Sequence, residues 1–327
     1  MRTLALATAL TLAALGTAHA AELKMGTLAP KGSAWAKILE KGAKEVDAKT
    51  AGRVKLKYFF GGQLGDEKDM VRQMKLGSVD GGAVTAVGLS LIKGDVRVLE
   101  MPLLFKNEKE IDHVRNALAP EFEKQFLDAG YVLLAWGDIG WTHLMTGVEV
   151  KSKADLKSIK MWAWTDDIIV RTLFKRIGVN GVPLGVPDVL PALQTGTING
   201  CYGSPLVGIA LQWYTKVKFA SSTPLNYSIG ALIVRKETWA KISPEDQTAI
   251  RTAFTAMGQE LQKTVRKDNE RAKKAMEKAG VKFVAIPADL MADIEKEAKG
   301  STVELTGKLF KQELLDKVMK SIAEVRK

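Results

Sequence analysis

Hydrophobic and polar positions follow two alternating patterns along most of the chain, which predicts strands and helices in turn. Residues 22–26 and 54–60 have the short apolar runs of strands, and the segment between them repeats its apolar side chains at a helical period. A second helix is expected between Asp66, a residue typical of helix N-caps, and Gly77, a typical helix stop. Residues 79–87 are expected to form a third strand. This order predicts an α/β fold with a mainly parallel sheet and helices on its faces.

The second half of the chain repeats this order. Its expected elements are a strand at 159–164, a helix at 166–177 capped by Thr165, a short strand at 182–184 and a helix at 188–195. The ends of the two units also resemble each other: 76–82 and 195–201 both contain a glycine, a β-branched residue, and an acidic or amide residue followed by glycine. The repeat and the element order together indicate two α/β lobes of related design.

A long helix is predicted in the last third of the chain. Ser243 and Pro244 are typical of a helix start, and Gly280 is the first stop signal after them. About 35 residues at ~1.5 Å per residue give a helix on the order of 50 Å long. This length exceeds one lobe, so the helix is expected to span both.

The first twenty residues have the pattern of a secretory signal peptide. A short basic head precedes an apolar segment, and Ala18 and Ala20 supply the small residues that predict cleavage before Ala21. A buried N-terminal helix is the alternative, but a strand-like pattern begins at Glu22. No cysteine lies at the cleavage point, so no lipid anchor is expected. Residues 1–20 therefore predict a periplasmic protein.

Composition and motifs argue against several other classes of protein. The net charge is +11, and about +10 once cleavage removes Arg2; outside the cytoplasm it has little opportunity to meet nucleic acid, so no nucleic-acid partner is expected, and a role at a cell surface or an anionic membrane stays open. The single cysteine, Cys201, excludes an internal disulfide and a cysteine-rich metal site. Neither His113 nor His143 has a second histidine at metal-ligand spacing, and nucleotide-binding and nucleophile-elbow motifs are missing. The sequence predicts no catalytic residue, no metal and no cofactor.

Three stretches resemble the solute-binding receptors of tripartite ATP-independent periplasmic (TRAP) transporters, of the DctP type. They are Phe60–Glu67, Asp155–Trp162 and Ala192–Gly200. The resemblance implies a two-lobe periplasmic-binding-protein architecture with a central cleft, crossing strands and a long lobe-spanning helix. It also implies a receptor that captures a small molecule and delivers it to the integral membrane subunits of the transporter. The expected lobes are 21–139 plus 229–266 for lobe I, and 140–228 plus 267–327 for lobe II.

The sequence departs from the family pattern where the family places two arginines that grip a ligand carboxylate. Trp162 and Thr142 stand at these positions, and neither side chain can form the bidentate contact of a guanidinium. Receptors without these arginines resemble a branch that is associated with tetratricopeptide-repeat partner proteins. The expected ligand is therefore largely apolar or neutral. If a carboxylate binds after all, Arg97 and Arg171 are the candidate replacement cations.

Aromatic and small polar residues form the expected ligand site. Trp162 and Trp164 share one face of a strand because side chains alternate along it. For each tryptophan the alternative is packing in the core of a lobe. The full set of candidate ligand-binding residues is Trp162, Thr142, Trp141, Tyr202, Trp164, Trp35, Thr85, Phe105 and Gly203.

A second function fits the same residues. The chain can be a periplasmic ligand or lipid carrier, or the partner of a sensor, that is not coupled to a permease. Genes for membrane permease subunits next to this one would favour the transport receptor, and a sensor kinase or lipid-handling operon would favour the alternative.

Overall fold

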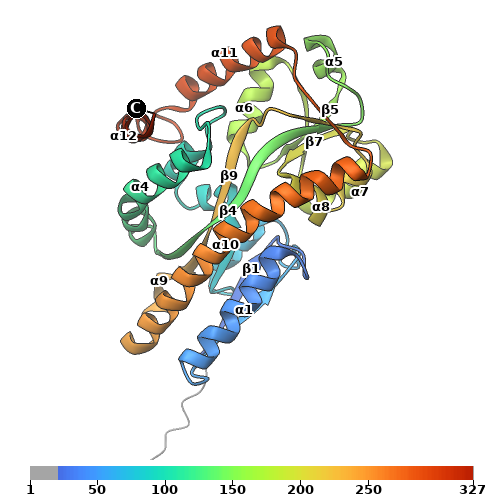
Figure 1. The fold of residues 1–327 in the computed structure, drawn as a ribbon. Coiled ribbons are helices and arrows are strands. Elements are labelled where there is room, and N and C mark those ends of the chain that lie inside the picture. Colours follow the sequence, from blue (N-terminus) through green and yellow to red (C-terminus); the bar gives the residue numbers. More distant parts are fainter. Residues whose placement is uncertain (1–20, 327) are drawn as a thin grey trace, which may run out of the picture.

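One long strand, β4 (Tyr131–Thr146), connects two groups of strands in this computed structural model, which describes residues 21–326. The strand order is β2-β1-β3-β9-β4-β7-β5-β6, with β8 beside the end of β4 and β10 beside β8. The first part of β4 pairs with β9 (Asn226–Arg235), and its last residues pair with β7 and β8. Figure 1 shows β4 and β9 running together through the middle of the molecule. The predicted signal peptide lies outside the described residues.

Lobe I is the part of the molecule that packs around β1, β2, β3 and the β9 end of the sheet. Its strands are β1 (Ala21–Thr27), β2 (Val54–Phe59) and β3 (Gly81–Thr85). Its helices are α1 (Ala34–Lys49), α2 (Glu67–Leu76), α3 (Ala86–Ser90), the 3-10 helix η1 (Gly94–Glu100), α4 (Glu108–Asp128), α9 (Lys236–Trp239) and α12 (Gln312–Val325).

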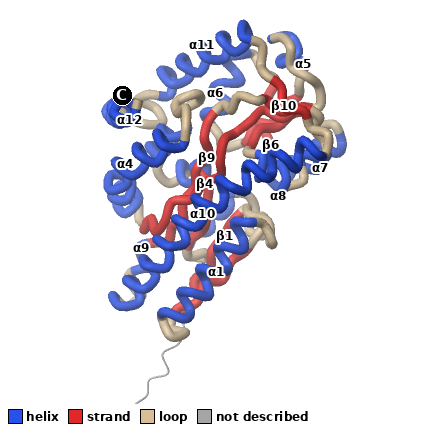
Figure 2. Tube along the Cα trace, viewed as in Figure 1, coloured by secondary structure: helices blue, strands red, loops and turns tan. Residues whose placement is uncertain are grey.

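Lobe II packs around the other end of the sheet. Its strands are β5 (Lys160–Trp164), β6 (Asn180–Leu184), β7 (Gly200–Gly203), β8 (Phe219–Ser221) and β10 (Lys282–Val284). Its helices are α5 (Lys153–Ser158), α6 (Ile168–Ile177), η2 (Val186–Asp188), α7 (Val189–Thr195), α8 (Pro205–Ala210), η3 (Trp213–Thr215) and α11 (Ala288–Leu305). Figure 2 shows the strands inside both lobes, with helices around them.

The predicted α/β fold with two lobes and crossing strands is confirmed, but the sheet is mixed. Pairing is parallel between β1, β2 and β3, and again between β5, β6 and β7. Pairing is antiparallel wherever the long strands β4 and β9 take part. The strand expected at 79–87 is shorter, because Thr85 caps α3 through the hydrogen bond from Val87 N to its hydroxyl.

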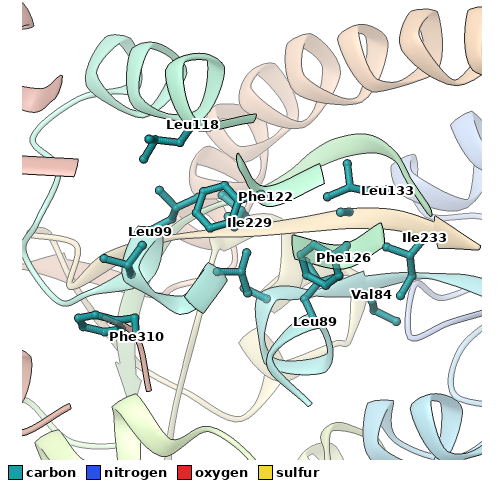
Figure 3. Packing of buried hydrophobic residues seen from close by; sticks show 14 of the residues in the cluster. Val84, Leu89, Leu99, Leu118, Phe122, Phe126, Leu133, Ile229, Ile233 and Phe310 are labelled. Atoms are coloured by element: carbon teal, nitrogen blue, oxygen red, sulfur yellow. The ribbon is translucent and has the colours of Figure 1, made fainter. Parts of the chain in front are cut away.

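The core of lobe I combines residues from both ends of the chain. Phe122 and Phe126 of α4 pack among side chains of β4 and β9, including Leu133 and Ile233 (Figure 3). Phe310, just before α12, belongs to the same core and lies near Leu99 in Figure 3. The C-terminal helix α12 thus packs on lobe I, within the segment 267–327 that the sequence alone suggests for lobe II.

The predicted long helix is α10 (Pro244–Lys278), with 35 residues. Ser243 caps it, since its hydroxyl accepts a hydrogen bond from Asp246 N. The helix runs beside both lobes: Glu260 pairs with Lys41 of α1, and Asn269 accepts a hydrogen bond from Leu206 N at the start of α8. Figure 1 shows it crossing β4 and β9 diagonally. No helix within residues 21–326 is long and apolar enough to span a membrane.

Candidate functional site

A cavity of about 180 Å³ lies between the two lobes. It receives side chains from β3 and η1 on the lobe I side, and from β5, β7 and the start of α6 on the lobe II side. Seven of the nine residues expected to bind the ligand line this cavity: Trp162, Thr142, Tyr202, Trp164, Trp35, Thr85 and Gly203. The structure therefore brings most of the predicted set together.

Trp141 and Phe105 lie elsewhere. Trp141 lines a second cavity, of about 170 Å³, and packs edge-on against Tyr227 with ring centroids 5.0 Å apart. It points away from Thr142 because neighbouring residues of β4 face opposite sides of the strand. Phe105 is buried in the core of lobe I. We leave both residues out of the candidate site.

The lobe II wall of the cavity is a cluster of aromatic rings. Trp162 stacks on Tyr202, with centroids 4.6 Å apart and ring planes 17° apart. Trp213 meets Trp162 edge-on at 5.2 Å, and Trp164 lies 6.0 Å away on the same strand. Trp162 is only 2% exposed, and its Nε1 donates to Leu184 O. Trp162 is thus part of the lobe II core as well as of the cavity wall.

The lobe I wall is held in place by hydrogen bonds to its own strands. Trp35 Nε1 donates to Asp138 O at 3.1 Å, which fixes the indole of α1 against β4. The Thr85 hydroxyl donates to Glu67 Oε2 and accepts a hydrogen bond from Val87 N. The polar atoms of both site residues are therefore engaged within lobe I.

Four buried carboxylate residues also line the cavity, and sequence reasoning did not place any of them there. They are Glu67, Glu100, Asp138 and Asp167. Glu67 accepts hydrogen bonds from Thr85 N, the Thr85 hydroxyl and Gly88 N. Burial raises the pKa of Glu67 to about 7. Both carboxylate oxygens of Glu67 therefore accept hydrogen bonds that join α2 to α3, which is a structural role.

Asp138 is the centre of a buried ionic cluster on β4. One oxygen accepts from Arg115 Nη1 at 2.6 Å, and the other accepts from the Tyr227 hydroxyl at 2.6 Å and Arg266 Nε at 2.8 Å. These three donors lie on α4, β9 and α10. The residue is fully buried and directly precedes the register shift between Asp138 and Gly140. Asp138 thus joins the crossing strands to the long helix.

Glu100 and Asp167 share one buried arginine across the two lobes. Arg97 Nη2 donates to Asp167 Oδ1 at 2.6 Å, and its Nη1 lies 3.3 Å from Glu100 Oε2. Burial raises the pKa of Glu100 to about 7, against the opposing effect of Arg97. Asp167 also caps α6 by accepting hydrogen bonds from Ile169 N and Val170 N. The cap predicted at Thr165 is therefore two residues further along the chain.

Neither candidate replacement cation lines the cavity. Arg97 is 2% exposed and held by its two carboxylates, and Arg171 donates to Thr165 O on the outside of lobe II. Among the described residues, the cavity lining includes four acidic side chains and no lysine, arginine or histidine. The wall of the cavity therefore combines aromatic rings with acidic side chains.

Sequence and structure comparisons give relatives of one kind. The family "Bacterial extracellular solute-binding protein, family 7" (DctP) matches residues 25–306. The 2,3-diketo-L-gulonate-binding periplasmic protein YiaO of Escherichia coli is 26% identical over 260 residues, which cover 78% of this chain and 77% of YiaO.

Two solved structures share the fold. The sugar acid binding protein DctPAm of Advenella mimigardefordensis, in complex with galactonate, has a TM-score of 0.87 and 19% identity, and the match covers 93% of this chain and 98% of that chain. A TRAP periplasmic solute-binding protein of Citrobacter koseri with bound D-glucuronate has a TM-score of 0.82 and 25% identity, and the match covers 93% of this chain and 99% of that chain.

Proposed function

We propose a class of ligand for this chain, which belongs to the bacterial extracellular solute-binding proteins, family 7. It is a TRAP-type periplasmic solute-binding receptor and not an enzyme. We propose that its solute is largely apolar or neutral and binds in the cavity between the lobes. The observation that carries this proposal is the lining of that cavity, where Trp35, Trp162 and Tyr202 contribute rings and no described lining residue is a cation.

Electrostatics argue against a small carboxylate in this cavity. An anion that leaves water without a paired cation has a large desolvation cost. The relatives above bind sugar acids, but here Trp162 and Thr142 stand where the family pattern places arginines, and Arg97 is engaged by Glu100 and Asp167. Carboxylates already lining the cavity would add repulsion. An apolar body, by contrast, gains from contact with the rings of lobe II.

Trp162 and Thr142, which replace the arginines of the family pattern, also bear on which partners this receptor has. We propose that solute leaves the cavity for the TRAP membrane subunits, and that a periplasmic tetratricopeptide-repeat protein is a further partner. Trp162 and Thr142 in place of arginines are the support for that second partner. Co-purification of a tetratricopeptide-repeat protein from periplasmic extract tests this part, and its absence in a crosslinked sample would contradict it.

The ligand class is tested by identification and by calorimetry. Native mass spectrometry of the purified protein, followed by extraction, should identify a solute whose main polar group is not a carboxylate. Titration with succinate and pyruvate should give no measurable heat at sub-millimolar concentration. Trp162→Arg restores the cation of the family pattern, and we expect it to lose affinity for the extracted solute. Micromolar binding of either acid to the wild-type protein would overturn the proposal.

A further inference from the structure

Two carboxylate oxygens at the cavity have no hydrogen-bond donor within residues 21–326. Asp167 uses only Oδ1, which accepts from Arg97 Nη2 and from the amides of Ile169 and Val170. Glu100 uses Oε1, which accepts from Ile229 N at 2.8 Å. Its Oε2 lies 3.3 Å from Arg97 Nη1, a nitrogen that forms no hydrogen bond. Asp167 Oδ2 and Glu100 Oε2 can therefore each accept a hydrogen bond from a ligand, although Glu100 Oε2 is also ion-paired with Arg97.

These two acceptors belong to residues that are almost completely removed from solvent. Glu100 is 3% exposed and Asp167 is 5% exposed, and both line the cavity. Neither oxygen is among the fully buried atoms that lack a partner, so each keeps exposed surface, and an exposed acceptor in a binding cavity is available to a donor on the ligand. The other two lining carboxylates differ, because both oxygens of Glu67 and of Asp138 are already paired.

Charge leads to the same conclusion. Arg97 supplies one positive charge between Glu100 and Asp167, so the trio has one negative charge in excess whenever both carboxyl groups are ionised. A cation in the cavity would neutralise that excess where solvent screening is weak. Glu100 lies on η1 of lobe I, and Asp167 caps α6 of lobe II. A donor between them would therefore contact both lobes at once.

We propose that the solute carries a positively charged nitrogen with N–H bonds, which donates to Glu100 Oε2 and Asp167 Oδ2 while the apolar body contacts the rings of lobe II. This inference rests on the proposed function, which puts the ligand in this cavity, and it narrows the proposed solute to a largely apolar body with a cationic group in place of a neutral one. The chemical class is a primary or secondary ammonium, or an amidinium or guanidinium, on an apolar body. A metal ion is a poorer match, because calcium and magnesium require six or more oxygen ligands and the cavity supplies two free ones.

The proposal is tested with three probes that share one apolar body. Phenethylamine, phenethyl alcohol and hydrocinnamate carry an ammonium, a hydroxyl and a carboxylate, and a cavity of ~150 Å³ accommodates a benzene ring. Calorimetry of the full mature protein should give phenethylamine at least ten-fold tighter binding than the alcohol, and no heat for hydrocinnamate. Phenethyltrimethylammonium, which has charge but no N–H bond, should bind at least ten-fold more weakly than phenethylamine.

Matched variants assign the effect to the two oxygens. Asp167→Asn keeps a side chain that caps helices well, and Glu100→Gln keeps an oxygen that can accept from Ile229 N. Each should weaken phenethylamine binding at least ten-fold and change binding of the alcohol less than three-fold. Asp166→Asn removes the same charge one residue away, at a residue that does not line the cavity, and should change both less than two-fold. Melting curves check that each variant is folded.

Several results would overturn the inference. They are equal binding of the amine and the alcohol, absence of amine binding, or equal losses in Asp166→Asn and Asp167→Asn. None of these contradicts the proposed function, which fails on a different result, the binding of succinate, pyruvate or hydrocinnamate at micromolar concentration. A nitrogen base in the solute extracted from the purified protein would support the inference, and a solute without basic nitrogen would contradict it.

Discussion

At the scale of the single residue, Trp162 has two roles. Its ring lines the cavity, while its stacking on Tyr202, its contact with Trp213 and its hydrogen bond to Leu184 O make it part of the lobe II core. From the sequence alone, cavity lining and core packing are alternative roles for each tryptophan. In a thin wall between a core and a cavity, one large side chain satisfies both descriptions.

We expect Trp162→Ala to weaken ligand binding and to destabilise the protein. Loss of a central aromatic contact weakens binding by about 2–4 kcal/mol, and truncation of a buried tryptophan lowers the free energy of unfolding by about 3–5 kcal/mol. Calorimetry with the extracted solute and urea unfolding on the same variant measure both. Trp141→Ala, in the second cavity, should lower stability but leave affinity within a few-fold. Full retention of affinity in Trp162→Ala would contradict the placement of the ligand.

Buried glutamates make stability depend on pH. Burial raises the pKa of Glu67 and of Glu100 to about 7, above the ~4.3 of an exposed glutamate. Between these values the folded protein holds more protons than the unfolded chain, so the free energy of unfolding falls as pH rises. From about pH 6 to about pH 8 each group should contribute a loss of about 1 kcal/mol.

Urea unfolding at the two pH values measures this loss. Glu67→Gln does not titrate at this position, so its free energy of unfolding should fall by about 1 kcal/mol less than that of the wild-type protein between the same two pH values. An equal change in the two proteins would show that Glu67 does not titrate in this range.

At the scale of the element, local signals predicted most helices and strands. Asp66 and Ser243 each cap the helix that the sequence assigns to them, because a cap depends on residues within a few positions of one another. Asp167 replaces Thr165 as the cap of α6, and the same Asp167 oxygen also accepts a hydrogen bond from Arg97, 70 residues away in the sequence. Carboxylate placement at the cavity depends on such distant partners, so the aromatic part of the site was predictable and the acidic part was not.

The ionic cluster at Asp138 should control how firmly β4, β9 and α10 are joined. We expect Asp138→Asn to lower the free energy of unfolding by about 3–5 kcal/mol, since it removes the fully buried charge partner of Arg115 and leaves this guanidinium with the partly solvated Asp112 alone. Asp112→Asn is the control, because Asp112 contacts the same two arginines but is partly solvated. Its loss should be smaller in urea unfolding. Equal losses would mean that burial at Asp138 does not decide the effect.

At the scale of the whole molecule, direct contacts hold the two lobes together around the cavity. Trp164 Nε1 of lobe II donates to Asp66 Oδ2 of lobe I at 2.7 Å, and Arg97 of lobe I pairs with Asp167 of lobe II. Ile169 of α6 packs into the lobe I core. The structure is therefore a closed arrangement of the lobes, in which part of the closing interaction is independent of the ligand.

Trp164→Phe should shift the ligand-free protein toward an open arrangement. The hydrogen bond it removes ends on a carboxylate, and such bonds contribute about 1.5–3 kcal/mol. Small-angle scattering without ligand should give a larger radius of gyration than for the wild-type protein, and saturation with the extracted solute should reduce it. Trp239→Phe, in lobe I and away from the cavity, should leave the radius unchanged. Identical radii for all three proteins would show that the Asp66 contact does not hold the lobes together.

The position of the single cysteine makes this receptor suitable as an optical reporter. Cys201 is fully buried on β7, and burial raises the pKa of its thiol, so thiol-reactive dyes should leave it unmodified in the folded protein. Cysteines introduced at exposed positions, such as Glu123 on α4 and Lys299 on α11, would then be the reactive sites. A fluorophore pair at those positions would report the distance between the lobes without removal of the native cysteine, and the same labelled protein would serve as a sensor for its solute.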